Sequence, residues 1–302
     1  IVGSRQCAGR VLAAAGPWRS TWPEAAAAMR TTILATSCLA ATAVSLRREA
    51  PAALVAQEAV HNKTAARPCN CESVSAHWTG AAPRPSKCVF IDLGAADGNT
   101  FRKFISDGYG PVHNCPSGGD WEAYLVEANP RFEQNLKSLE AQYPGKVHAM
   151  PSTAAYMCEA TTSFFLDTTN HGQNYWGSSM SASHPDVVKS GQVKVTVPTM
   201  NVIRTVMEHT VQGDWVMLKM DIEGAEWDIV PCLAKSPYLG LLDAFYLEQH
   251  PRDWNPDTET TEGEMNSAKS YIQSRGVYMP DYFSQTLIHV NSTLVANGTH
   301  LG

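Results

Sequence analysis

The chain has 302 residues, of which 44% are hydrophobic and 17% charged, and its formal net charge is -6 at pH 7. This composition is typical of a globular protein and excludes an intrinsically disordered one. Binding along a nucleic-acid backbone needs a surface rich in Lys and Arg. The chain is acidic and has no basic run with interleaved aromatic residues, so we expect no nucleic-acid partner.

The N-terminal part of the chain differs in character from the rest. Residues 1–28 are alanine-rich and lack a regular pattern, and we interpret them as upstream or non-native residues. Residues 29–46 have the pattern of a signal peptide or leader, because Arg30 precedes an apolar run and small residues suited to cleavage follow it. That run is shorter than the roughly 20 residues of a spanning helix, so we expect no stable membrane span. Residues 47–86, rich in Ala, Pro and Ser, are interpreted as a linker.

Two features bear on the compartment. Asn62, Asn291 and Asn297 each begin an Asn-x-Ser/Thr glycosylation motif. Six cysteines follow the leader, an even number that suits disulfides in an oxidising compartment. The Cys69-Asn-Cys71 pair predicts a disulfide or two thiols rather than zinc, because no partner pair follows at zinc-finger spacing. We expect the secretory pathway or the extracellular space; a bipartite leader to a plastid is the alternative.

From residue 87 to 290, apolar runs of strand length alternate with helical patterns. Such alternation predicts a parallel sheet covered by helices. We expect strands at Cys88–Leu93, Ala123–Val126, Lys146–Met150, Val216–Met220 and Ala244–Glu248, and helices at Thr100–Ser106, Pro130–Gln142, Asn201–His209, Ala225–Leu233 and Glu264–Ser274. Residues 291–302 form a polar tail.

Two further patterns complete the domain. Short apolar runs at Thr162–Leu166 and Val193–Val197 flank a polar stretch, residues 167–190, which we expect to form a loop or lid over the site. At the end of the domain, Val277–Met279 and Gln285–Val290 are expected to form an antiparallel hairpin at the sheet edge. The candidates for ligand contact in the polar stretch are His171, Tyr175, Trp176 and His184.

The first candidate site is the turn after the first strand, in the segment VFIDLGAADGNTF. The strand ends at Asp92, and Gly94 and Gly98 allow a tight turn whose backbone approaches a ligand. The spacing is G-x-x-x-G and not the G-x-G-x-x-G of dinucleotide binders, so a ligand without a phosphate fits better. The alternative is an ordinary turn in which Asn99 or Asp97 caps the helix.

An acidic residue, Glu127, ends the next strand in the segment AYLVEANP. In nucleoside-binding α/β folds, a carboxylate at this place accepts hydrogen bonds from both ribose hydroxyls. We therefore expect Glu127 to bind the ribose of a nucleoside cofactor. The alternative is a carboxylate that stabilises the start of the helix before Pro130.

The third candidate is the segment VMLKMDIEGAEWDIV, residues 216–230. Lys219, Asp221 and Glu223 occupy alternate positions, so they point to one face of an extended segment. The segment FYLEQH ends the next strand, and Glu248 and His250 share one face there. Neighbouring parallel strands end at the same edge of a sheet, so four ionisable groups meet there. They are Lys219, Asp221, Glu248 and His250, and the packing of a core does not require them. In the alternative interpretation, Asp221 or Glu223 caps the following helix and Glu226 lies in its first turn. For Glu223 and Glu226 we favour this position at the helix start over a catalytic role.

These segments occur in a fixed order. FIDLGAADGNTF, YLVEANPRFEQNL and LKMDIEGAEWDIV appear together with GSSM, VPTMNVI and YLEQH, and over roughly residues 88–250 the chain resembles the FkbM family of S-adenosylmethionine-dependent methyltransferases. The most diagnostic piece is K-x-D-x-E-G-x-E, complete from Lys219 to Glu226. One departure is Asn201, which stands where the family commonly has an aspartate and which affects a local helix cap.

The resemblance implies an α/β fold, a Rossmann-like methyltransferase three-layer sandwich whose mostly parallel seven-strand sheet has an antiparallel edge strand. It implies S-adenosyl-L-methionine as cofactor and methyl transfer to an oxygen, often a sugar or polyketide hydroxyl, so the expected partner is a small-molecule or glycan acceptor. The candidate catalytic residues are Asp221, His250 and Glu248, and the candidate cofactor-binding residues are Asp92, Gly94, Gly98, Asn99 and Glu127.

Methyl transfer requires an acceptor oxygen held in line with the methyl group and a base that takes its proton. We expect His250 or Asp221 to be the base, Glu248 to orient the histidine, and Lys219 to balance charge. No metal ligand is assigned; a divalent metal held by Asp221 and Glu248 is an alternative. Two rival functions are a nicotinamide oxidoreductase, which the glycine spacing disfavours, and a catalytically inactive binding or structural subunit with the same fold.

Overall fold

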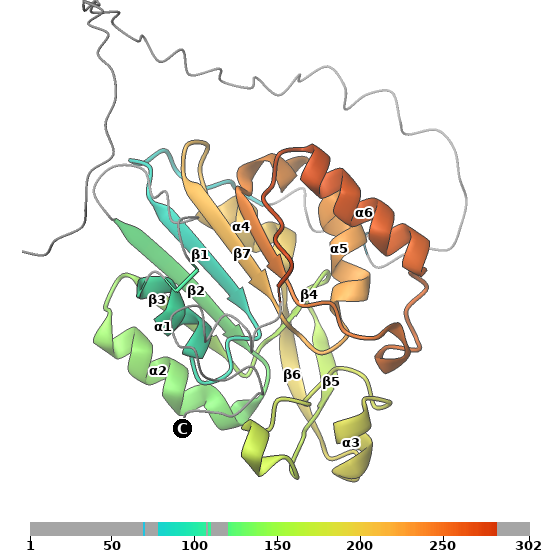
Figure 1. Ribbon diagram of the computed structural model, residues 1–302. Coiled ribbons are helices and arrows are strands. Elements are labelled where there is room, and N and C mark those ends of the chain that lie inside the picture. The colour runs from blue at the N-terminus through green and yellow to red at the C-terminus, as the bar shows by residue number, and fades with distance from the viewer. Residues whose placement is uncertain (1–68, 70–77, 107, 110–119, 283–302) are drawn as a thin grey trace, which may run out of the picture. The chain divides into compact units, whose positions relative to one another are not determined.

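A computed structural model of the protein describes residues 69, 78–106, 108–109 and 120–282. Its centre is a five-stranded sheet in the order β3-β2-β1-β7-β8, in which all neighbouring strands run parallel (Figure 1). The chain moves outward from β1 to β3 and then returns to the other side of β1, so the strand order reverses between β1 and β7. The strands are β1 (Cys88–Leu93), β2 (Trp121–Glu127), β3 (Val147–Pro151), β7 (Trp215–Met220) and β8 (Ala244–Leu247).

Helices pack on both faces of this sheet because successive strand side chains point to opposite sides. In β1, Phe90 packs with Phe101 and Leu136 of the helices on one face. Val89 belongs to the core on the other face, together with Trp227. The first face carries α1 (Asn99–Ile105) and α2 (Glu133–Gln142), and the second carries α4 (Val202–His209), α5 (Glu226–Lys235) and α6 (Glu262–Ser274).

A smaller three-stranded sheet lies below the main one in Figure 1. It consists of β4 (Ala154–Tyr156), β6 (Lys194–Asn201) and β5 (Thr161–Phe165), with β4 parallel and β5 antiparallel to β6. The two short apolar runs of the sequence therefore pair with each other as β5 and β6. The chain between them contains α3 (Pro185–Lys189). The short 3₁₀ helices are η4 (Pro130–Phe132), η5 (His171–Gln173), η6 (Pro237–Leu241) and η7 (Arg252–Trp254).

The strands and helices predicted between Cys88 and Ser274 all occur, with boundaries shifted by a few residues at most. The expected seven strands are not confirmed, since the main sheet has five within the described residues. At its edge, Tyr278 forms a single parallel bridge with Ala244, and Val277–Met279 is not a strand. The second half of the expected hairpin, Gln285–Val290, lies outside the described residues.

A disulfide joins Cys69 to Cys232 in α5, which confirms the expectation of a disulfide rather than zinc at Cys69. Cys88 at the start of β1 and Cys158 are disulfide-bonded as well. The upstream segment is thus tied covalently to the helix that follows β7. Among the described helices, none combines the length and apolar character needed to cross a membrane.

Candidate active site

A cavity of about 410 Å³ opens where β1, β2, β7 and β8 end. Open parallel sheets bind their ligands at this edge, and the volume is in the range of small-molecule sites. The structure brings six of the eight candidate residues to its wall, and the other two, Asp92 and Gly98, are not part of it. Those on the wall are Gly94, Asn99, Glu127, Asp221, Glu248 and His250.

Lys219 and Asp92 lie beneath the cavity between β1 and β7. The Lys219 ammonium donates a hydrogen bond to the Gly94 carbonyl at 2.7 Å and lies 3.3 Å from Asp92 Oδ1 and 3.5 Å from Asp221 Oδ2. The other Asp92 oxygen accepts a hydrogen bond from the Thr100 hydroxyl in α1. Burial alone would lower the pKa of Lys219, but the Asp92 and Asp221 carboxylates outweigh it and the pKa is raised. The buried lysine therefore stays charged and joins the two strands.

The glycines of the first turn allow neighbouring segments of the chain to pack closely. Gly94 has φ +80, and a Cβ atom there would collide with the Asp221 carbonyl oxygen. Gly98 has φ +86 and faces the Leu139 side chain of α2. The Asp97 carboxylate accepts a hydrogen bond from the Asn99 backbone N–H at 3.0 Å, next to the start of α1. Gly94 thus lets the β1 and β7 loops meet, which sets the floor of the cavity.

Glu127 is buried at the end of β2 with its carboxylate facing the cavity. One oxygen accepts a hydrogen bond from the Ala96 N–H at 2.7 Å and the other from the Asn129 N–H at 2.7 Å. Burial raises the pKa of Glu127 to about 7, although these two N–H groups oppose the shift. The following η4 is capped by Asn129, which accepts from the Arg131 N–H at 3.1 Å, so Glu127 is not needed as a helix cap. A carboxylate has about four acceptor positions, and two remain for a vicinal diol.

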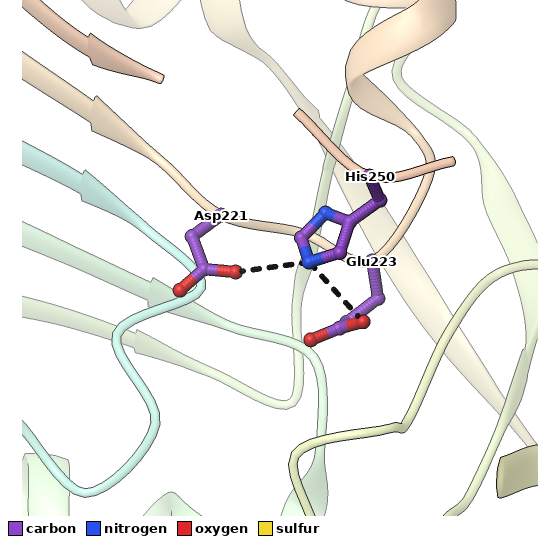
Figure 2. Close-up of side chains that lie close together, drawn as sticks. All are labelled: Asp221, Glu223 and His250. Carbon is purple, nitrogen blue, oxygen red and sulfur yellow. Dashed lines mark ion pairs between the residues drawn. The ribbon is translucent and has the colours of Figure 1, made fainter. Parts of the chain in front are cut away.

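Three ionisable side chains converge on another part of the same cavity wall. Asp221 follows β7, Glu223 lies in the next turn and His250 follows β8. Figure 2 shows both carboxylates directed at His250 Nε2, which is 3.7 Å from Asp221 Oδ1 and 3.4 Å from Glu223 Oε2. One ligating atom from each residue lies within 4.8 Å of the other two.

The histidine is oriented by Glu226, where the sequence led us to expect Glu248. The same Glu226 oxygen lies 3.0 Å from His250 Nδ1 and accepts the His250 backbone N–H at 2.7 Å. Glu226 is fully buried at the start of α5, and the Trp254 ring stacks on the imidazole with a centroid distance of 5.4 Å. Burial alone would lower the pKa of His250, but Glu223 and Glu226 outweigh it and raise the pKa to about 10.

Glu223 is held toward His250 by its surroundings. Its φ of 55 is a left-handed conformation that non-glycine residues rarely adopt. Its carbonyl accepts the Ser179 hydroxyl at 2.6 Å, and its carboxylate lies 3.1 Å from His184 Nε2. The alternative of a helix cap is wrong for Glu223 and Asp221, because α5 begins at Glu226 after Ala225 and has no side-chain cap. The expectation that Glu226 lies in the first turn is confirmed.

The polar stretch between β5 and β6 contributes to the cavity wall. Tyr175 and Trp176 line it, whereas His171 is exposed and contacts the Tyr175 hydroxyl. His184 is buried behind Glu223, and its ring packs edge-on against Trp254 at 4.3 Å. Sequence reasoning missed Trp254, which lies in η7 outside the strand-end motifs and has no pattern that marks it.

The parallel sheet, the buried acidic residue after β2 and the cavity at the carboxyl edge define an α/β protein with the site of a nucleoside-binding fold. Residues 92–258, more than half of the chain, match the family model of the methyltransferase FkbM domain. The chain therefore belongs to the FkbM methyltransferase family, as its motifs indicated. No curated protein and no solved structure matches it.

Proposed function

We propose that the protein transfers a methyl group from S-adenosylmethionine to a hydroxyl oxygen of a sugar or another small-molecule acceptor. The observation that carries this proposal is a single cavity lined both by Glu127 and by the cluster of Asp221, Glu223 and His250. Glu127 suits a ribose, and the cluster suits an acceptor hydroxyl that must lose a proton. When bound, S-adenosylmethionine supplies a methyl group on a positively charged sulfur.

The cofactor end of the cavity is built for a nucleoside without phosphates. The two unused acceptor positions of the Glu127 carboxylate match the two hydroxyls of a ribose. The rest of the wall is acidic, which favours a cationic ligand over the pyrophosphate of a nicotinamide cofactor. The carboxylates on the wall are Glu127, Asp186, Asp221, Glu223 and Glu248.

At the acceptor end, we assign the base to Asp221 or to the neutral form of His250, which is the minority form at neutral pH because the pKa of this histidine is raised to about 10. The Asp221 side chain is 18% exposed and so is open to a hydroxyl in the cavity, and His250 is fixed in place by Glu226. Glu248 lies on the same wall. General base action at a fixed distance contributes typically about 10²- to 10⁴-fold to a rate. Replacing His250 by Ala is therefore expected to lower turnover by about that factor while leaving cofactor affinity within a few-fold.

The cofactor assignment is tested by calorimetric titration of the full chain with S-adenosylmethionine and, separately, with NAD. We expect saturable binding of the first and none of the second. Turnover is then measured with isotope-labelled methyl groups on a panel of hydroxylated sugars and small molecules. Failure to bind S-adenosylmethionine contradicts the proposal, whereas binding without any turnover favours an inactive methyltransferase-fold subunit.

We also propose that the protein enters the secretory pathway and carries glycans at Asn62, Asn291 and Asn297. The Cys69–Cys232 disulfide supports an oxidising compartment, because cytosolic thiols are kept reduced. Mass spectrometry of the protein from its native host, before and after glycosidase treatment, is expected to show a mass loss at these asparagines. An unglycosylated protein argues for another destination, such as a plastid.

A further inference from the structure

We propose that Asp221, Glu223 and His250 together bind one divalent metal ion of the Mn²⁺ or Mg²⁺ type at the acceptor end of the cavity. Ion binding follows from these three side chains alone. Its role, to bind and polarise the acceptor hydroxyl in place of a free Asp221 or His250 base, rests on the proposed methyl transfer.

The first argument is the spacing around His250 Nε2. The two carboxylate oxygens lie 3.4 and 3.7 Å from this nitrogen, longer than the roughly 2.7–2.9 Å of a charge-assisted hydrogen bond. No hydrogen bond to Nε2 occurs within the part of the chain that the structure describes, although His250 is only 8% exposed. Ligands about 2.1 Å from a common ion lie about 3 Å apart, so small shifts of these atoms accommodate an ion between them.

The second argument is the other face of the imidazole. His250 Nδ1 lies 3.0 Å from the buried carboxylate of Glu226, which accepts hydrogen bonds only. With Nδ1 donating to Glu226, the nitrogen that faces Asp221 and Glu223 is Nε2, which Figure 2 joins to both carboxylates. Metal-binding histidines are oriented in this way by a second carboxylate. If His250 only formed ion pairs with Asp221 and Glu223, a third carboxylate, that of Glu226, would not be needed to orient its ring.

The third argument is the conformation of Glu223. A left-handed φ at a glutamate costs on the order of 1–3 kcal/mol, and it persists only where the surroundings impose it. Here the Ser179 hydroxyl holds the carbonyl and His184 holds one carboxylate oxygen. The strain does not serve a helix cap, since α5 has none from a side chain. It places the carboxylate opposite Asp221 instead.

The donor set indicates the kind of ion. Two carboxylates and one neutral imidazole offset the charge of one divalent cation, and oxygen-rich sets suit Mg²⁺ and Mn²⁺, with the nitrogen favouring Mn²⁺. Three protein ligands leave open positions for the acceptor oxygen and for water. The sequence-based alternative paired Asp221 with Glu248; the structure groups Asp221 with Glu223 and His250 instead.

The test is Mn²⁺ binding to the full chain after metal removal with a chelator. Calorimetry and electron paramagnetic resonance are expected to show one Mn²⁺ per chain, with a nitrogen coupling from the imidazole in the pulsed spectrum. Asp221→Asn and Glu223→Gln are expected to weaken binding by about 10- to 100-fold. His250→Gln is expected to abolish the nitrogen coupling, which a purely structural role would not change. Mg²⁺ is expected to compete for the site.

The matched control is Glu248→Gln, because the Glu248 carboxylate lies on the same wall but outside the cluster. This variant protein is expected to bind Mn²⁺ like the wild type. Thermal melts establish that each variant is folded. Absence of stoichiometric Mn²⁺ binding, or binding that survives Glu223→Gln unchanged, overturns the proposal. Methyl transfer at full rate in excess chelator overturns the role of the ion but leaves the proposed function intact. Mn²⁺ binding without S-adenosylmethionine binding contradicts the proposed function alone.

Discussion

The carboxylate of Glu127 combines a fixed orientation with a raised pKa. Its two oxygens are fixed by the Ala96 and Asn129 N–H groups, so its remaining acceptor positions point in defined directions. The same burial that fixes it disfavours its charge and raises its pKa to about 7. The residue is therefore poised to change protonation near neutral pH.

We predict that S-adenosylmethionine affinity is highest above pH 7 and decreases as the pH falls below it. The ionised carboxylate accepts both ribose hydroxyls, whereas the protonated acid loses acceptor capacity. Calorimetry at pH 8 and pH 6 tests this, with about a tenfold loss per pH unit as the limit. Glu127→Gln is expected to bind about 10- to 100-fold more weakly at pH 8 and to show no such pH dependence. A pH response that persists in the Gln variant assigns it to another group.

The raised pKa of Glu127 affects the free energy of unfolding in the opposite direction to the predicted cofactor affinity. In the unfolded chain the pKa of Glu127 is near the ordinary glutamate value of 4.5, and in the folded protein it is about 7. Its contribution to the free energy of unfolding is therefore fully present below pH 4.5 and is lost as the pH rises through 7. Cofactor binding and stability thus place opposite demands on this residue.

The hydrogen bonds of the Asn201 side chain explain why an asparagine suits this position, where the family commonly has an aspartate. Its side-chain oxygen caps α4 by accepting the Arg204 N–H at 3.0 Å, while its amide nitrogen donates to the Met157 carbonyl. An aspartate keeps the cap but presents an acceptor to that carbonyl inside the protein. We predict that Asn201→Asp lowers the free energy of unfolding by about 1–3 kcal/mol in urea denaturation. Equal stability of the two proteins would show that the amide contact contributes nothing.

At the scale of elements, the approach of β1 to β7 fixes the floor of the cavity. β1 is buried throughout and β7 is buried after Trp215, and Lys219 joins the two strands by contacting Asp92 and the Gly94 carbonyl. The Asp221 backbone N–H donates to the Leu93 carbonyl at 3.1 Å, so the chain after β7 continues along β1. The position of Asp221 is set by this contact.

Gly94→Ala tests this arrangement. The added Cβ would collide with the Asp221 carbonyl, and φ +80 is strained for alanine. We predict a loss of at least about 2 kcal/mol in unfolding free energy and a displaced Asp221, measured as a lower melting temperature and as lost turnover. Gly172→Ala is the matched control, since nothing lies within 4 Å of its added Cβ, and it is expected to melt within a degree or two of the wild type. Comparable melting of both variants would contradict the close approach.

The elements themselves were predictable because their side chains repeat. The nearly continuous apolar run of β1 reflects the burial of both sheet faces, and the apolar residues of α4 follow the helical period. The second sheet was less predictable, since β4 is only three residues long. The resemblance to the FkbM family supplied the Rossmann-like architecture, and the order of the strands in the sheet comes from the structure.

The site was predictable where a residue ends a strand, and less so where a turn redirects the chain. Asp221, Glu248 and His250 follow strands, and all three reach the cavity. Glu223 looked like a helix cap because acidic residues are common before helices. A left-handed turn at Glu223 and Gly224 directs the side chain to His250 instead, and the sequence does not specify this conformation. Glu226 was assigned to the helix start correctly, but its contact with His250 joins α5 to the chain after β8 and is non-local.

At the scale of the whole molecule, the described chain upstream of the sheet is anchored by one covalent bond. Cys69 is bonded to Cys232 across a sequence separation of 163 residues, and Cys232 is buried in the core between α5 and the sheet. Closing so long a loop restricts the unfolded chain strongly, by about 5 kcal/mol in the chain-entropy account, with measured effects more often 2–4 kcal/mol. The disulfide is thus a large share of a marginal total stability.

We predict that the double variant Cys69→Ala, Cys232→Ala unfolds at a lower denaturant concentration, with a loss of about 2–5 kcal/mol. The double variant leaves no unpaired thiol from this bond, and it leaves the bonds of Cys88 and Cys158 intact, which chemical reduction would not. Non-reducing peptide mapping of the wild type should recover one peptide pair containing Cys69 and Cys232. Because α5 also carries Glu226, the residue that orients His250, a loosened helix is expected to lower turnover before the fold is lost. Unchanged stability together with the mapped bond would mean that the packing of α5 against the sheet suffices, and that the disulfide only tethers the upstream chain.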